Sequence, residues 1–238
     1  MQAEALNAET PGHIVRKIAQ AAGSKSLPRY IAVEGPIGVG KTTLARRLAE
    51  SFGYSMLRES ATDNPFLDRF YAEGNQHALP TQLFFLLQRA RQVQDMPSND
   101  LLGTSLVADF LIEKDKLFAK LTLDEAEYAL YLQIHDSLQL NPPAPDLVIY
   151  LQAPAEVLDE RIRGRGIAAE QHIQLEYLHS LAECYTEFFY YYDAAPLLVV
   201  NAAEIDFANN NDHFEALLDQ IIHMEGARQF FNPTPTLL

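Results

Sequence analysis

The stretch Gly35–Thr42 carries residues whose types and spacing suit phosphate binding. It reads GPIGVGKT and matches the pattern G-x-x-x-x-G-K-[ST], in which glycines let backbone N–H groups turn toward phosphates. The Lys41 ammonium would meet the β- and γ-phosphates, and the Thr42 hydroxyl is an oxygen ligand suited to Mg²⁺. We therefore expect a nucleotide site built from Gly35, Pro36, Ile37, Gly38, Val39, Gly40, Lys41 and Thr42.

A second chemical group follows the next apolar run of the chain. Glu59 comes directly after a predicted strand at 54–57, which we place beside the strand that leads into the phosphate loop. A carboxylate at the carboxyl end of a parallel strand faces the ligand crevice of an open α/β sheet. There Glu59 could take the proton of a hydroxyl group that attacks the γ-phosphate. The alternative is an exposed charge at a strand end.

A phosphate loop does not by itself say what becomes of the nucleotide. Switch proteins that bind GTP also carry D-x-x-G at the end of a strand and a later N-K-x-D. Asp100–Gly103 fits the first pattern, but it precedes a predicted strand at 105–109, and N-K-x-D does not occur. The sequence therefore disfavours a GTP-binding switch.

Alternating strands and helices must position these groups. The predicted strands are nearly continuous in apolar character, which is typical of strands buried on both faces. They lie at 30–33, 54–57, 105–109, 147–151 and 197–200, and the predicted helices at 41–52, 81–95, 123–139, 154–163, 170–192 and 212–224. This alternation predicts an α/β fold, a doubly wound five-stranded parallel sheet with helices on both faces.

The outer parts of the chain are expected to differ from this domain. Residues 30–230 are predicted to form a single domain. Residues 1–29 form an N-terminal extension with a short helix at 13–22, and 231–238 an irregular tail with two prolines.

Composition narrows the range of partners. The 238 residues hold 18 Lys and Arg against 32 Asp and Glu, and the net charge of −14 disfavours nucleic acid and anionic membranes as partners. Cys184 is the only cysteine, so an intramolecular disulfide is impossible, as suits a reducing compartment. Apolar runs such as 83–87 are too short to span a membrane, and the N-terminus lacks a signal-peptide pattern. We expect a cytoplasmic protein.

Taken together, the motifs resemble those of the deoxynucleoside kinases, and most of all the bacterial deoxyadenosine/deoxyguanosine kinase type. The resemblance covers roughly residues 30–207 and rests on 30–49, Glu59, 64–67, 70–71, 80–84, 118–119, 146–152, 160–165, Glu170 and 177–178. It implies a P-loop kinase fold with a helical lid. It also implies ATP with Mg²⁺ as phosphate donor and a deoxynucleoside 5′-hydroxyl as acceptor, with purine deoxynucleosides favoured.

The resemblance also implies roles for single residues. Glu59 would be the general base, Tyr71 and Glu170 would bind the sugar 3′-hydroxyl, and Gln82 would bind the edge of the base. A primary amide presents a donor and an acceptor side by side, which suits Gln82 to this task. Arg89 follows seven residues later, on the same helix face. The alternatives are that Gln82 is a surface amide at the start of a helix and that Tyr71 is a half-buried core ring.

The predicted lid at 161–170 holds Arg161, Arg163 and Arg165. Arginines there would contact ATP and stabilise charge on the transferring phosphoryl group. The alternative is that they are cations favoured by the dipole at a helix end. The family carries a further arginine where this chain has Ile167, so either Arg163 takes over or transition-state stabilisation is weaker.

A second departure follows the third predicted strand. The resembling enzymes show Asp/Glu-Arg-Ser, whereas this chain has Asp109-Phe110-Leu111. Asp109 keeps the acid, which would hold Mg²⁺ together with Thr42. Lys114 lies one helical turn after Phe110 and could bring a substrate-binding cation to the same face. The alternative for Lys114 is a solvated charge.

Two other functions remain open at this stage. A thymidylate-kinase-like nucleoside monophosphate kinase would need further cations for the acceptor phosphate, for which Arg69, Arg89 and Arg91 are candidates. A non-catalytic nucleotide-binding module is motivated by the missing arginine after Asp109. The apolar helices at 81–95 and 123–139, together with the family's tendency to dimerise, predict a homodimer.

Overall fold

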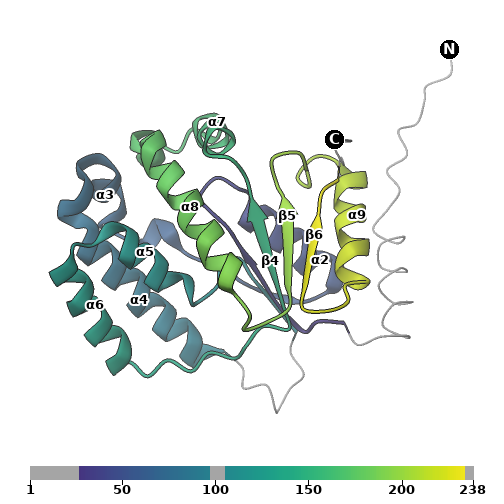
Figure 1. Cartoon of the computed structure of the whole chain (residues 1–238), viewed down its shortest axis with the longest axis horizontal. Coiled ribbons are helices and arrows are strands. Elements are labelled where there is room, and N and C mark those ends of the chain that lie inside the picture. Colours follow the sequence, from purple (N-terminus) through teal and green to yellow (C-terminus); the bar gives the residue numbers. More distant parts are fainter. Residues whose placement is uncertain (1–26, 97–104, 234–238) are drawn as a thin grey trace.

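A parallel sheet runs through the middle of the molecule, with helices on both of its faces (Figure 1). The computed structural model describes residues 27–96 and 105–233. The six strands lie in the order β2-β3-β1-β4-β5-β6, and every neighbouring pair is parallel. They are β1 (Tyr30–Glu34), β2 (Ser55–Leu57), β3 (Leu106–Ala108), β4 (Leu147–Gln152), β5 (Leu197–Asn201) and β6 (Arg228–Phe231). The doubly wound α/β fold is confirmed, with six strands instead of five.

Each helix predicted between residues 41 and 224 has a counterpart in the structure. The helices are α2 (Lys41–Phe52), α3 (Leu67–Glu73), α4 (Ala78–Asp95), α5 (Lys114–Thr122), α6 (Glu125–Ser137), α7 (Ala155–Arg165), α8 (Leu175–Tyr191) and α9 (Asn211–Ile222). Three short 3₁₀ helices, η1 (Ala61–Asp63), η2 (Gly74–His77) and η3 (Ala169–His172), join them. The structure adds α3 and α5, which we did not predict. The helix expected at 13–22 and the segment Asp100–Gly103 lie outside the described residues.

The central strands are apolar on both faces because each face is covered. In β1, Ile31 and Val33 pack into a core with α2, α7 and α9. Tyr30 and Ala32, which point the other way, pack into a second core with α8. Side chains of a strand alternate between the two faces of a sheet, so this division follows from the pleat. No helix of the described part has the length and apolarity to cross a bilayer.

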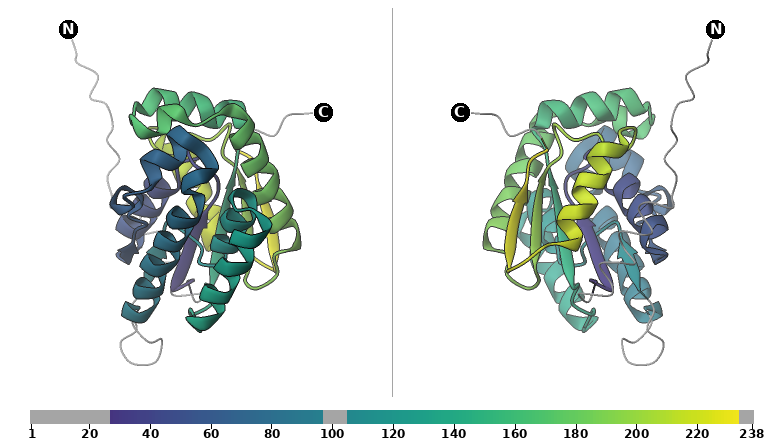
Figure 2. Two further views of the ribbon diagram at one scale, coloured as in Figure 1. Left: turned by 90° about the vertical axis from the view of Figure 1, so that its left-hand side faces the viewer. Right: turned by 90° about the vertical axis from the view of Figure 1, so that its right-hand side faces the viewer.

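The predicted strand number is wrong because β6 lacks a continuous apolar run. This strand reads RQFF, alternates between exposed and half-buried positions, and pairs with β5 at the edge of the sheet (Figure 2). Phe230 is 73% exposed. The sheet thus extends to Phe231, where we expected the irregular tail to begin. An edge strand needs little apolar surface, so its pattern is weak in sequence.

The predicted neighbour of the phosphate-loop strand is also wrong. β3 lies between β1 and β2, so Glu59 follows a strand that is one place farther from the loop. β3 and β4 flank β1 on opposite sides, and the direction of winding reverses there. Ligands of such sheets bind at this point, outside the carboxyl ends of the strands.

The predicted helix at 170–192 is divided in two. The Arg163 guanidinium donates to the carbonyl oxygens of Gln171 and Ile173, at 2.9 Å for Ile173. These carbonyls therefore point to the end of α7 and do not continue a helical ladder. The chain forms η3 and then restarts as α8 at Leu175.

The turn from β1 into the phosphate loop depends on a glycine. Gly35 has φ +150°, and a Cβ at this position would collide with the carbonyl oxygen of Leu151 in β4. The loop then ends at Gly40, with φ +105°, where α2 begins. The path of the loop therefore follows from the close packing of β1 on β4.

We expect Gly35→Ala to lower the free energy of unfolding by about 1–3 kcal/mol, because an overpacked site must distort. Gly164→Ala is the matched control. A Cβ at Gly164 meets nothing within 4 Å, and its helical backbone should make the change neutral or stabilising by up to ~1 kcal/mol. Urea titration followed by circular dichroism measures both. A Gly35→Ala protein as stable as the parent would contradict this account of the loop.

Candidate active site

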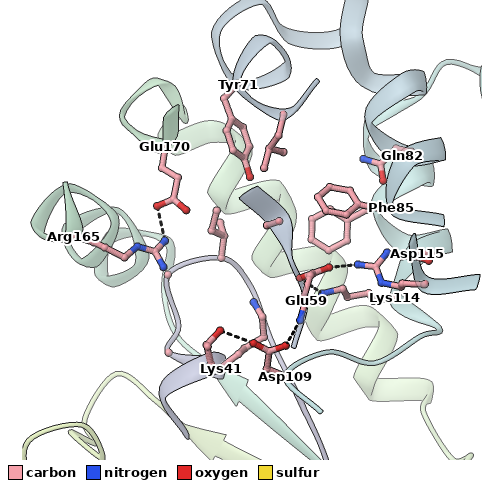
Figure 3. Close-up of a pocket in the computed structure, with 18 of the residues that line it drawn as sticks. Lys41, Glu59, Tyr71, Gln82, Phe85, Asp109, Lys114, Asp115, Arg165 and Glu170 are labelled. Carbon is pink, nitrogen blue, oxygen red and sulfur yellow. Dashed lines mark hydrogen bonds and ion pairs between the residues drawn. The ribbon is translucent and has the colours of Figure 1, made fainter. Parts of the chain in front are cut away.

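A pocket opens at the carboxyl ends of the central strands, between the phosphate loop, α3, α4, α5 and the α7–η3 segment (Figure 3). Most of the predicted site residues line it, namely Ile37, Gly38, Gly40, Lys41, Thr42, Glu59, Tyr71, Gln82, Asp109, Lys114, Arg165 and Glu170. The predicted residues outside its lining are Gly35, Pro36, Val39, Arg161 and Arg163. Groups far apart in sequence thus share one cavity.

The phosphate loop holds its lysine close to its own backbone. Lys41 Nζ donates to the carbonyl oxygens of Gly35 at 2.7 Å and Pro36 at 3.1 Å. Burial lowers the pKa of Lys41 to about 8, Lys114 acts in the same direction, and three nearby carboxylates partly oppose both. The loop leads directly into the N-terminus of α2, whose free N–H groups and dipole favour an anion.

Asp109 connects the loop to the neighbouring strand ends. Its Oδ2 accepts from the Thr42 hydroxyl at 2.6 Å, and its Oδ1 accepts from the backbone N–H of Glu59 at 2.7 Å. A carboxylate and a hydroxyl in contact are the hard oxygen ligands that Mg²⁺ prefers. No group of three or more His, Cys, Asp or Glu side chains in the described part could hold a metal alone. The pair therefore fits an Mg²⁺ that also takes phosphate oxygens and water.

Two cations flank the Glu59 carboxylate. Arg89 from α4 donates to Oε1, and Lys114 Nζ from α5 lies 3.0 Å from Oε2. Burial by itself raises the pKa of Glu59. The positive charges of Lys114, Arg89 and Lys41 outweigh this effect and lower the pKa to about 2. Glu59 is therefore an ionised hydrogen-bond acceptor at neutral pH.

The alternative of a solvated Lys114 is wrong. The residue is only 2% exposed, and its ammonium group also lies 5.9 Å from the ring centre of Phe118 and 6.0 Å from that of Phe110. Phe110 itself is fully buried. A cation thus reaches the site from the first residue of α5, although the position after Asp109 carries a phenyl ring.

Tyr71 and Glu170 lie on one side of the pocket and Gln82 on the other (Figure 3). Burial raises the pKa of the Tyr71 phenol well above its usual range, with Tyr177 and Glu170 acting in the same direction. Tyr71 therefore keeps its proton as a donor. Glu170 Oε2 accepts from Arg165 at 2.5 Å, which leaves its other oxygen as an acceptor.

The Gln82 amide is held from one end. Its Nε2 donates to the Thr122 hydroxyl oxygen at 3.2 Å, and that hydroxyl donates its own proton to the Phe118 carbonyl at 2.8 Å. Among the described residues, nothing else is bound to the Gln82 amide, so its oxygen and second N–H remain for a ligand, in one plane. Gln82 is 5% exposed, so a planar polar group is presented from a buried position.

Our sequence analysis missed the partner of Arg89. Arg89 and Asp115 are each 4% exposed, form an ion pair and line the pocket. The Arg89 guanidinium also lies 5.4 Å from the ring centre of Phe85 and 5.6 Å from that of Phe110. Arg89 Nε and Asp115 Oδ2 have no partner among the described residues. The seven-residue spacing from Gln82 indicated the place of Arg89, but no local signal linked it to α5, a helix that we did not predict.

Only one of the three lid arginines faces the pocket. Arg161 donates to the Ala202 carbonyl at 2.8 Å. Arg163 is bound to carbonyls that follow the lid and lies 3.1 Å from the Asp159 carboxylate. Arg165 lines the pocket, and Ile167 is 41% exposed. In this arrangement, Arg161 and Arg163 bind backbone carbonyl groups of the segments that pack beside α7.

Comparisons with known proteins support the resemblance seen in the sequence. A model of the deoxynucleoside kinase family matches residues 31–224. The chain is 36% identical over 193 residues to a deoxyguanosine kinase of Bacillus subtilis (strain 168), which covers 79% of this chain and 93% of that protein. It is 32% identical over 188 residues to a deoxyadenosine kinase of Dictyostelium discoideum, at 77% and 73% coverage.

Solved structures agree with these relatives. The deoxyadenosine kinase from M. mycoides with bound dATP has a TM-score of 0.70 at 26% identity, covering 81% of this chain and 98% of that chain. The same enzyme with the products dCMP and a flexible dCDP bound also has a TM-score of 0.70, at 25% identity and 81% and 97% coverage. The fold, the pocket and the family match agree: the chain belongs to the deoxynucleoside kinases, a family of phosphotransferase enzymes.

Proposed function

We propose that this enzyme transfers the γ-phosphoryl group of ATP to the 5′-hydroxyl of a deoxynucleoside, with purine deoxynucleosides preferred. The observation that carries the proposal is the position of the ionised Glu59 carboxylate, which shares one pocket with the phosphate loop. Relatives named deoxyguanosine kinase and deoxyadenosine/deoxycytidine kinase support the acceptor class. The reaction needs a base and a phosphate cradle in reach of one substrate, and the pocket offers both.

Glu59 would accept the proton of the substrate's 5′-hydroxyl while the 5′-oxygen forms a bond to the γ-phosphorus. The bond between that phosphorus and the β–γ bridging oxygen then breaks, and ADP leaves with the electron pair. The Lys41 ammonium would leave the Gly35 and Pro36 carbonyl oxygens and bind the phosphate oxygens instead. Arg165 would act from the lid. Mg²⁺, when bound by Thr42 and Asp109, would neutralise charge on the phosphates.

The rest of the pocket suits a nucleoside. Tyr71 would donate to the sugar 3′-hydroxyl, and Glu170 would accept from it. Gln82 would pair with the edge of the base, and the rings of Phe85 and Phe118 would contact its faces. Arg89 and Asp115 also line the pocket, and their charged groups add polar surface that would suit a large polar base such as a purine.

The pocket gives less support to a monophosphate acceptor. Of the three arginines considered for an acceptor phosphate, Arg69 and Arg91 are exposed and do not line the pocket. Arg89 is bound to Glu59 and Asp115. A monophosphate would therefore add charge near Glu59 without a free cation from this set.

We also propose that the enzyme acts in the cytoplasm as a homodimer. α4 and α6 lie side by side at one end of the molecule (Figure 1). They expose Leu87 and Leu130, which are 46% and 45% accessible. Covering these leucines with a second copy would remove apolar surface from water.

A substrate panel tests the proposed function directly. ATP consumption measured with the four deoxynucleosides and, separately, with their 5′-monophosphates should show turnover only with nucleosides, fastest with a purine deoxynucleoside. Turnover confined to monophosphates would support the thymidylate-kinase-like alternative. Binding of ATP without turnover on either panel would support a non-catalytic module.

Glu59→Gln should reduce kcat by roughly 10²–10⁴-fold, the range for a positioned general base. The amide keeps the shape of the side chain but cannot take the proton. KM for the nucleoside should change little, because the sugar and base contacts lie elsewhere in the pocket. Steady-state kinetics measures both constants, and an unchanged kcat would remove Glu59 from the mechanism.

Gln82→Leu should raise KM for the preferred nucleoside and reduce discrimination among bases. Each polar base atom left without a partner costs about 1–3 kcal/mol. Gln94→Leu makes the same change at an exposed position of α4 and should leave the ranking of nucleosides unaltered. If Gln82→Leu keeps the parent's ranking as well, Gln82 does not bind the base.

A further inference from the structure

We propose that Glu34 and Tyr185 together position Lys114, and that Lys114 supplies the cation that this chain lacks directly after Asp109. The inference rests on the proposed function. Neither Glu34 nor Tyr185 lines the pocket, so both would be positioning residues, and Lys114 is the group that they would place. Lys114 would contact the reacting oxygens and would be the catalytic member of the set.

Glu34 is a fully buried carboxylate at the end of β1. Its Oε1 accepts from the Gly35 N–H at 2.8 Å and from the Tyr185 hydroxyl at 2.9 Å. Its Oε2 accepts from the Leu111 N–H at 2.7 Å and lies 3.6 Å from Lys114 Nζ. Burial of a carboxylate is costly unless donors and cations meet its oxygens, and here both oxygens are met.

These contacts join three separate parts of the fold. Gly35 opens the phosphate loop, Leu111 belongs to the connection from β3 to α5, and Tyr185 lies in α8. Lys114 is the first residue of α5, three positions after Leu111. By holding the Leu111 N–H, Glu34 fixes where α5 begins relative to the loop, and it thereby places the root of the Lys114 side chain.

Lys114 lies between two carboxylates of different character. Glu59, at 3.0 Å, also binds Arg89, and it would lose its charge on accepting the substrate proton. Glu34, at 3.6 Å, does not line the pocket and has no part in the proton transfer proposed above. As Glu59 becomes neutral, its attraction for Lys114 falls and that of Glu34 remains. Lys114 would then stay in place, with its charge free to stabilise negative charge on the 5′-oxygen and the phosphoryl group.

The place of Tyr185 is fixed by packing. Its ring stacks on those of Tyr150 and Phe189 in the core beneath α8, so its hydroxyl has one direction in which to point. That direction leads to Glu34. Tyr192 belongs to the same core, and its buried hydroxyl has no partner among the described residues. The two tyrosines therefore form a matched pair for experiment.

The first test changes the cation. Lys114→Met should lower kcat roughly 10²–10³-fold, as expected for loss of a group that stabilises transition-state charge, with a much smaller change in nucleoside KM. Lys114→Arg should recover part of the lost kcat. If Lys114 has only a structural role, the folded Lys114→Met protein should keep the parental kcat, whatever its loss of stability.

The second test asks whether Tyr185 acts through Lys114. Tyr185→Phe should lower kcat several-fold, whereas Tyr192→Phe should not. In the Lys114→Met background, Tyr185→Phe should have no further effect on kcat, because the group that it positions is gone. Glu34→Gln should behave like Tyr185→Phe but more strongly. If that variant does not fold, the tyrosine cycle still decides the question.

The outcomes separate this inference from the proposed function. A parent enzyme that phosphorylates deoxynucleosides, with Lys114→Met at the parental kcat, would overturn only the role of Lys114. Full additivity of Tyr185→Phe and Lys114→Met would overturn the positioning role of Glu34 and Tyr185. A parent that turns over no deoxynucleoside would overturn both proposals.

Discussion

The site depends on the ion pairs that keep the Glu59 carboxylate ionised, because a carboxylate that is partly shielded from water needs cations beside it. Arg89 and Lys114 bind its two oxygens, and each cation has a second carboxylate behind it, Asp115 and Glu34. The result is a chain of five alternating charges, of which all but the half-buried Glu59 are buried. Removing one partner from such a set leaves an unpaired buried charge, which typically costs 3–5 kcal/mol.

This requirement explains why several elements converge on one edge of the sheet. β1 ends in Glu34, β2 leads to Glu59, and α4 and α5 carry the cations. Asp109 connects the same edge to the phosphate loop through the Thr42 hydroxyl. The two apolar cores hold the sheet and the helices that cover it, and a third apolar cluster packs α4, α5 and α6 together. The charge chain adds ionic contacts where the strand ends meet α4 and α5. In an acidic chain of net charge −14, the phosphate loop brings Lys41 to this same edge, where an anionic nucleotide would bind.

Much of the site could be predicted because its signals are local. The phosphate loop is a short motif between a strand and a helix, and the spacing from Gln82 to Arg89 follows the helical period. Long-range pairing was harder to predict. The contact between Arg89 and Asp115 joins two helices with no fixed spacing between them, and the place of β3 between β1 and β2 depends on how the chain crosses the sheet. β6 was not predicted for a related reason, because its pairing with β5 at the sheet edge leaves no strong apolar pattern in the sequence.

The ion pair between Arg165 and Glu170 has a consequence for the order of events at the pocket. Under the proposed function, one member serves the phosphate donor and the other the sugar of the acceptor. A triphosphate that draws Arg165 away would free both oxygens of Glu170 for the 3′-hydroxyl, and a bound sugar would in turn loosen Arg165 for phosphate. By thermodynamic linkage, each substrate would then raise the affinity of the other by the same factor. A single salt bridge would thus make the two substrates bind synergistically, although they need not touch until the phosphoryl group moves.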